Sequence, residues 1–146
     1  MYGNDGFREL APPDCLRLLA RVSVGRVVYT RGALPAVLPV GFGVDRDGAV
    51  LLRTSATSEL VVAIDGVVVA FEADEIDAAD HSGWSVVVTG RATVVRDATE
   101  RERPARTGPA SGAPRPREVL VRIEPELVTG CQLVGGKGAL GVERPT

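Results

Sequence analysis

Alternation of apolar and polar residues is the strongest structural signal in this chain, and it predicts a protein built mainly from β-strands. Short valine-rich runs are separated by turn residues, which is typical of antiparallel strands joined by hairpins. Asp47-Gly48, a pair that tolerates the positive φ of a tight turn, predicts one such hairpin. We expect strands over residues 26–30, 34–45, 49–54, 67–73, 84–97, 119–123 and 128–134.

A helical period appears at two places in the sequence. Pro12 and Asp14 mark the first helix start, because proline suits the first turn and aspartate can cap free N–H groups. Leu16 and Leu19 then form an apolar stripe. A second, short helix fits residues 55–65, where β-branched residues weaken the pattern. The pattern therefore predicts an antiparallel β-barrel of six or seven strands with flanking helices.

The length of 146 residues favours a single domain spanning residues 1–146. Residues 98–118 are rich in Pro, Arg, Gly and Ala and have no apolar period, so we expect a mobile excursion there, with a helical turn possible at ATERER. Residues 135–146 read as a loose tail. The tail holds a Gly-x-Gly-x-x-Gly pattern from Gly136, but no strand–helix unit follows it, which favours the tail interpretation over a dinucleotide site.

Charge and composition argue against several classes of function. The net charge of −2 and the pI near 5.5 give no support for a nucleic-acid-binding surface. The N-terminus lacks the apolar region of a signal peptide, and no apolar run reaches membrane-spanning length, so we expect a cytoplasmic protein. Cys15 and Cys131 match no metal-binding spacing and are expected to be reduced thiols.

An acidic stretch could suggest a metal site. It contains one histidine and no second ligand motif, so a solvated loop is the favoured interpretation and we expect no metal. The same histidine reads as a polar loop residue rather than a catalytic base. The residues concerned are Glu72, Asp74, Glu75, Asp77, Asp80 and His81.

The stretch RTSATS, residues 53–58, lies where a strand ends and the second helix would begin. Its hydroxyls, backbone N–H groups and one arginine together suit a phosphate. Taken alone, the stretch is better explained by a serine or threonine that caps the helix.

The only tryptophan stands at the start of the valine-rich strand over residues 84–97. Both faces of this strand are largely apolar, so both must be covered. One face can line the barrel interior, and the other must meet a helix, a second subunit or a ligand. Alternation assigns Trp84, Val86 and Val88 to one face and Ser85, Val87 and Thr89 to the other.

The segments GRVVYT, LPAVLPVGFGVD, VLLRTS, VVVAFEADEID and GWSVVVTGRATVV, in this order, resemble the pyridoxamine 5′-phosphate oxidase-like flavoproteins. The nearest resemblance is to the small bacterial branch that includes nitroimidazole-resistance proteins, and it covers about residues 16–97 and 119–134. It implies a split β-barrel that forms a homodimer, with FMN in clefts between the subunits.

The resemblance also implies positions for the cofactor. The flavin phosphate would lie near Arg53, Thr54, Ser55 and Ser58. The ring would lie beside Pro39, Val40 and Gly41 and beside Trp84 and Ser85, so that Trp84 borders the flavin or packs at the dimer seam. Family members carry a basic residue just after the serine that corresponds to Ser58, and this chain has Glu59 and Leu60 there.

The function that the resemblance implies is an FMN-dependent oxidoreductase acting on a small organic substrate. The flavin would do the redox chemistry, and no side chain is singled out as a catalytic acid or base. Two alternatives stay open: a non-catalytic dimer that binds a flavin or another flat ligand for storage or sensing, and a relative with a degenerate cofactor site. A deazaflavin in place of FMN is also open.

Overall fold

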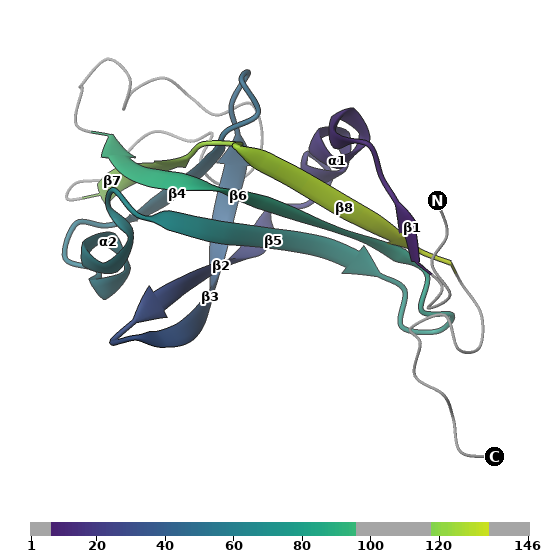
Figure 1. The fold of residues 1–146 in the computed structure, drawn as a ribbon, viewed down its shortest axis with the longest axis horizontal. Helices are drawn as coiled ribbons and strands as arrows, with labels where there is room; N and C mark the ends of the chain where they lie inside the picture. The colour runs from purple at the N-terminus through teal and green to yellow at the C-terminus, as the bar shows by residue number, and fades with distance from the viewer. Residues whose placement is uncertain (1–6, 96–117, 135–146) are drawn as a thin grey trace.

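The computed structural model describes residues 7–95 and 118–134, and residues 98–117 and the glycine pattern of the tail lie outside this part. Two helices and eight strands are present in the described residues (Figure 1). They are β1 (Phe7–Glu9), α1 (Pro12–Leu19), β2 (Val24–Arg31), β3 (Leu34–Val44), β4 (Val50–Ser55), α2 (Glu59–Ile64), β5 (Val68–Ile76), β6 (Gly83–Val95), β7 (Glu118–Ile123) and β8 (Leu127–Leu133).

The strands form a closed antiparallel barrel in the order β6-β5-β2-β3-β4-β7, and β7 pairs back with β6. β8 adds to the free half of β6, and β1 adds to β8. The predicted mostly β, antiparallel barrel with flanking helices is therefore confirmed, and its ring has six strands. β1 was not expected, because three residues of one strand carry too short a pattern to recognise. No helix in the described residues is long and apolar enough to span a membrane.

The longest strand, β6, belongs to two parts of the sheet. Residues 83–89 pair with β8, whereas residues 92–95 pair with β7. The change of partner occurs at Gly90, where a Cβ atom would lie 1.7 Å from the carbonyl oxygen of Glu124. Gly90 is therefore a point of close backbone approach.

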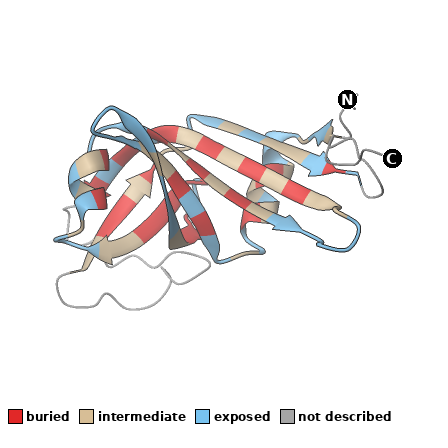
Figure 2. Cartoon of the chain, turned by 90° about the horizontal axis from the view of Figure 1, so that it is seen from below, coloured by how far each residue is buried: buried red, intermediate tan, exposed pale blue. Residues whose placement is uncertain are grey.

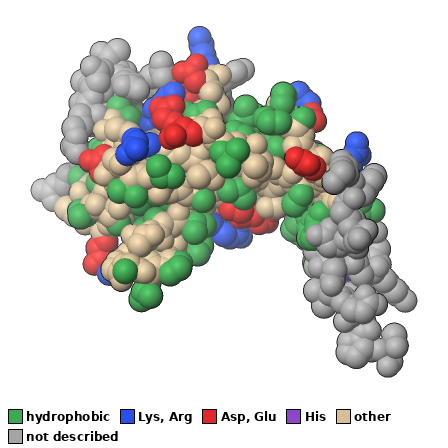
Figure 3. Space-filling view, viewed as in Figure 1, with side chains coloured by type: hydrophobic (Ala, Val, Ile, Leu, Met, Phe, Trp, Pro, Cys, Tyr) green, Lys and Arg blue, Asp and Glu red, His purple; other side chains and the backbone are tan. Residues whose placement is uncertain are grey.

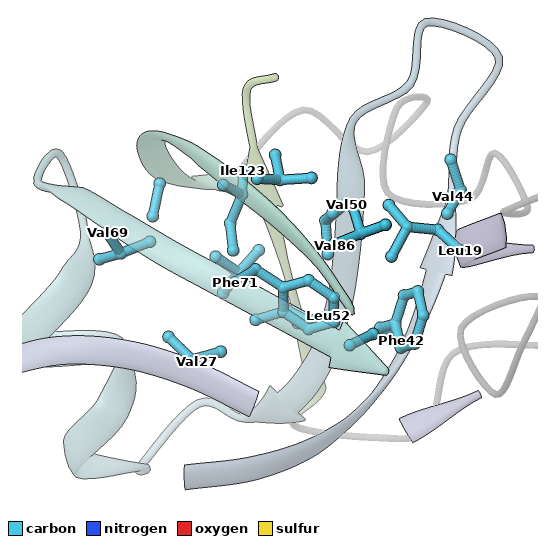
Figure 4. Packing of buried hydrophobic residues seen from close by; sticks show 14 of the residues in the cluster. Leu19, Val27, Phe42, Val44, Val50, Leu52, Val69, Phe71, Val86 and Ile123 are labelled. Carbon is cyan, nitrogen blue, oxygen red and sulfur yellow. The ribbon is translucent and has the colours of Figure 1, made fainter. Parts of the chain in front are cut away.

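Buried and partly exposed residues alternate along the barrel strands (Figure 2). The inward side chains come from every strand of the ring and meet in one cluster (Figure 4). At its centre the rings of Phe42 and Phe71 lie 4.7 Å apart at an interplanar angle of 58°. Leu19 of α1 and Ile64 of α2 join the same cluster, so each helix buries its apolar side against the barrel.

One buried charge pair joins two distant parts of the barrel. A guanidinium nitrogen of Arg122, on β7, lies 2.6 Å from a carboxylate oxygen of Asp45, which follows β3. Asp45 is almost fully buried, and Arg122 also donates to Glu124 at 2.7 Å. Burial lowers the pKa of Arg122, but its bonds to Glu124 and Asp45 outweigh that effect and raise the pKa, which keeps the guanidinium charged.

Candidate functional site

The outward face of β3, β2, β5 and β6 brings together three of the residues expected beside a flavin ring, namely Pro39, Gly41 and Ser85. In the strand register Pro39 lies beside Arg26, Arg26 beside Glu72, and Glu72 beside Val87. The Ser85 hydroxyl donates to Glu72 at 3.1 Å, so Ser85 is on this face as well. Because directly paired residues point to the same face, Pro39 and Ser85 share one continuous surface.

Trp84 and Val40 point to the opposite, inward side, as strand alternation requires. Trp84 is 6% exposed and belongs to the core cluster that includes Leu19 of α1. Its indole N–H donates to Glu75 at 3.3 Å. The predicted division of β6 into two faces is therefore confirmed. Contact of Trp84 with a flavin or a second subunit stays a prediction.

A polar cluster, which we define as Arg26, Glu72, Asp74 and Ser85, occupies the outward face between Pro39 and Ser85. Arg26 lies 3.1 Å from Glu72 and 3.3 Å from Asp74. Burial raises the pKa of Glu72, and hydrogen bonding to Asp74 and the charge of Asp74 raise it further. The Ser85 hydrogen bond and the charge of Arg26 act in the opposite direction and are outweighed.

The residues expected to hold a phosphate do not all point the same way. Arg53 and Ser55 lie on the outward face of β4, while Thr54 pairs with Val119 on the inward side. The Arg53 side chain is only 9% exposed and lies 3.6 Å from a carboxylate oxygen of Glu118. A phosphate near Arg53 would therefore compete with this carboxylate.

Ser58 is the N-cap of α2, because its hydroxyl accepts the backbone N–H of Leu60 at 3.1 Å. The hydroxyls of Ser55 and Thr57 lie 2.9 Å apart, and Ser55 also accepts the Thr57 N–H. The capping interpretation of this stretch is confirmed. These hydroxyls already have partners within the turn.

The two positions where the family carries basic residues differ in environment. Leu60 is 2% exposed and packs in the core, whereas the Glu59 side chain is 75% exposed. Glu59 forms a 2.6 Å ion pair with Arg31 at the end of β2. The sequence pattern does not single out Arg31, because its position beside α2 results from barrel closure and has no local signal in the chain.

The acidic loop after β5 is stabilised by hydrogen bonds between its own carboxylates and its backbone N–H groups. The Asp77 carboxylate accepts the N–H groups of Ala79 at 2.7 Å and Asp80 at 3.1 Å. The Asp80 carboxylate accepts both donors of Ser82, and these hydrogen bonds lower its pKa. His81 adopts a positive φ of 61° within this turn. In the part of the chain that the structure covers, no three His, Cys, Asp or Glu residues are placed to hold a metal.

Comparison with known proteins identifies the chain's relatives. The family model of pyridoxamine 5′-phosphate oxidase matches residues 12–132. The uncharacterized protein Rv0080 of Mycobacterium tuberculosis is 46% identical over 131 residues, which cover 86% of this chain and 85% of that protein.

Two solved structures share the fold and about a third of the sequence. The FAD binding protein of Mycobacterium smegmatis superposes with a TM-score of 0.68 at 32% identity, covering 86% of this chain and 97% of that one. A putative pyridoxamine 5′-phosphate oxidase of Corynebacterium glutamicum gives a TM-score of 0.67 at 32% identity, covering 90% and 96%. Sequence, barrel topology and the order of the motifs thus agree that this chain belongs to the pyridoxamine 5′-phosphate oxidase family.

Proposed function

We propose that the protein binds a flavin on the outward face of its barrel and acts as a flavin-dependent oxidoreductase on a small organic substrate. The observation that carries this proposal is the single outward surface shared by Pro39, Gly41 and Ser85, which continues over β4 to Arg53 and Ser55. Family membership and the FAD-binding relative of M. smegmatis support it. A bound flavin would supply the redox chemistry, and the chain would hold and orient it.

The two ends of a flavin would meet different surroundings. The face beside Pro39 carries donors and acceptors in Arg26 and Glu72, which are paired with each other at 3.1 Å. Near the phosphate position, Arg53 is paired with Glu118 and Arg31 with Glu59. A phosphate would gain these arginines only by displacing a carboxylate, so we expect phosphate binding to be weak.

The substitution Glu59→Lys is expected to strengthen FMN binding about 10-fold, since a charge-assisted contact is worth about 1.5 kcal/mol. It releases Arg31 from its ion pair and adds a cation at an exposed position. Leu60→Lys would instead bury a charge in the core and is not a useful test. The measurement is a flavin-fluorescence titration with FMN, FAD and riboflavin.

Riboflavin has no phosphate, so its affinity should be the same for the wild type and Glu59→Lys. Glu9→Lys makes the same charge change on the exposed strand β1 and serves as the matched control. An equal gain in FMN affinity from both variants would mean that overall charge, and not a phosphate site near α2, controls binding.

A second copy of the chain is proposed to cover the same outward face. Exposed valines lie on it, among them Val24, Val37 and Val68. Figure 3 shows hydrophobic side chains on the projecting β2–β3 hairpin, which carries Val37. Exposed apolar residues clustered on one face are typical of an interaction surface. We expect a homodimer that buries more than about 2,000 Å².

The substitution Val37→Glu is expected to weaken the dimer at least 10-fold, because it places a charge in an apolar interface (roughly 1.5 kcal/mol or more). Val37 is 60% exposed in the described chain, so the change should leave the monomer folded. Sedimentation equilibrium measures the dissociation constant. Val62→Glu, on the outer side of α2, is the control and should have no effect. A wild-type protein that is monomeric at micromolar concentration would refute the dimer.

Two measurements separate the functional alternatives. Mass spectrometry of the small molecule released on denaturation distinguishes FMN, FAD and a deazaflavin, and finding none of these would favour the degenerate-site alternative. Oxidation of NAD(P)H by the flavin-loaded protein would support an oxidoreductase. A loaded protein that is inert toward NAD(P)H and other reductants would support the storage or sensing alternative.

A further inference from the structure

The polar cluster lies among Val24, Val37 and Pro39 on the outward face, which also carries Thr89 and Arg91 of β6. Within the cluster one guanidinium, that of Arg26, faces the two carboxylates of Glu72 and Asp74. With both acids ionised the cluster therefore has a net charge of −1. Even without a second copy over this face, the side chain of Glu72 is only 22% exposed and that of Asp74 only 30% exposed.

Polar or charged groups face Glu72 from its own strand and from both neighbouring strands. Arg26 faces it from β2, Asp74 from β5 and Ser85 from β6. On β8, Cys131 pairs with Ser85 and so lies on the same face. Arg21, which follows α1, lines a surface hollow of about 430 Å³ together with Asp74.

We propose that Glu72 and Asp74 bind one additional proton per protomer when a second copy covers this face, so that falling pH favours the dimer. This inference rests on the dimer proposed above. Covering the face removes water from both carboxylates, and dehydration disfavours the charged form. A symmetric partner also brings a second cluster with the same net charge to the interface. Both effects favour uptake of a proton from solvent.

The direction of the pH dependence follows from proton counting. Burial already raises the pKa of Glu72 in the single chain, and further burial raises it again. At pH values between the pKa of Glu72 in the single chain and its higher pKa in the dimer, the dimer holds more protons than two separate chains. The dimer therefore gains stability as pH falls through that range. The range begins above the ordinary carboxyl pKa, which is about 4.3.

The test is sedimentation equilibrium of the purified protein at several pH values. With up to two protons taken up per dimer, the dissociation constant should fall about 10- to 100-fold between about pH 8 and about pH 5. Glu72→Gln keeps the shape of the side chain and removes the titration, so its dissociation constant should be low and nearly independent of pH. Glu9→Gln, on exposed β1, should behave like the wild type.

The possible outcomes distinguish failure of the pH inference from failure of the dimer proposal on which it rests. A wild-type dimer whose dissociation constant does not change with pH would overturn the inference and leave the dimer in place. So would an unchanged pH dependence in both Glu72→Gln and Asp74→Asn. A monomer at every pH would overturn the dimer itself. Circular dichroism of each variant confirms that the fold is intact.

Discussion

Gly90→Ala is expected to destabilise the protein by about 3 kcal/mol, because the added methyl group has no space. The Cβ would lie 1.7 Å from the carbonyl oxygen and 2.8 Å from the carbonyl carbon of Glu124. Both are backbone atoms, so no side-chain rotation relieves the overlap. The segment after β7 must move away from β6, at the place where β6 changes partner from β8 to β7.

Thermal unfolding measures this effect, and a loss of about 3 kcal/mol corresponds to a fall in Tm of about 10 °C for a chain of this size. Thr93→Ala lies on the same strand at an exposed position and should shift Tm by no more than a degree or two. Wild-type and variant proteins must be compared at one concentration, because a dimer makes Tm concentration-dependent. Equal Tm values for Gly90→Ala and the wild type would contradict the steric explanation, because they would show that a methyl group fits between the two backbones.

Arg122→Met is expected to cost a similar amount, about 3 kcal/mol, because it removes a charged partner and leaves a buried carboxylate behind. A guanidinium nitrogen of Arg122 lies 2.6 Å from a carboxylate oxygen of Asp45, whose side chain is only 4% exposed. Asp45 keeps the backbone N–H of Arg46 at 2.7 Å, but a neutral donor does not replace the positive charge of the guanidinium beside a buried carboxylate.

The double variant Arg122→Met with Asp45→Asn tests the cause. If the loss comes from the buried carboxylate, neutralising Asp45 should recover part of the stability of Arg122→Met, as a double-mutant cycle in urea would measure. Additive losses would assign the effect to the packing of the Arg122 side chain. Asp47→Asn is the control, since Asp47 is mostly exposed and lies 3.4 Å from Arg122.

Local chemistry in the sequence predicted most of the secondary structure. Period-two alternation placed the strands, Pro12 placed the first helix start, and Asp47-Gly48 placed the turn between β3 and β4. These features depend on residues next to one another in the chain, and local propensity and burial pattern decide them. The same alternation correctly divided β6 into a face with Trp84 and a face with Ser85.

Strand alternation divides the side chains of the candidate site between the two faces of each strand, although the residues are neighbours in sequence. Arg53 and Ser55 lie on one side of β4 and Thr54 on the other, and Pro39 and Val40 divide in the same way on β3. A motif read as a block of consecutive residues therefore overstates how many of their side chains can contact one ligand.

The sequence by itself determined where the seven longer strands lie and how the side chains of β6 divide between its two faces, because both follow from contacts between near neighbours. Only the tertiary structure decided which distant charges meet: Arg122 with Asp45, Arg31 with Glu59, and Arg26 with Glu72. Each pair depends on the order and register of strands in the closed barrel. That order is set by the packing of the whole core, which no single stretch of the chain encodes.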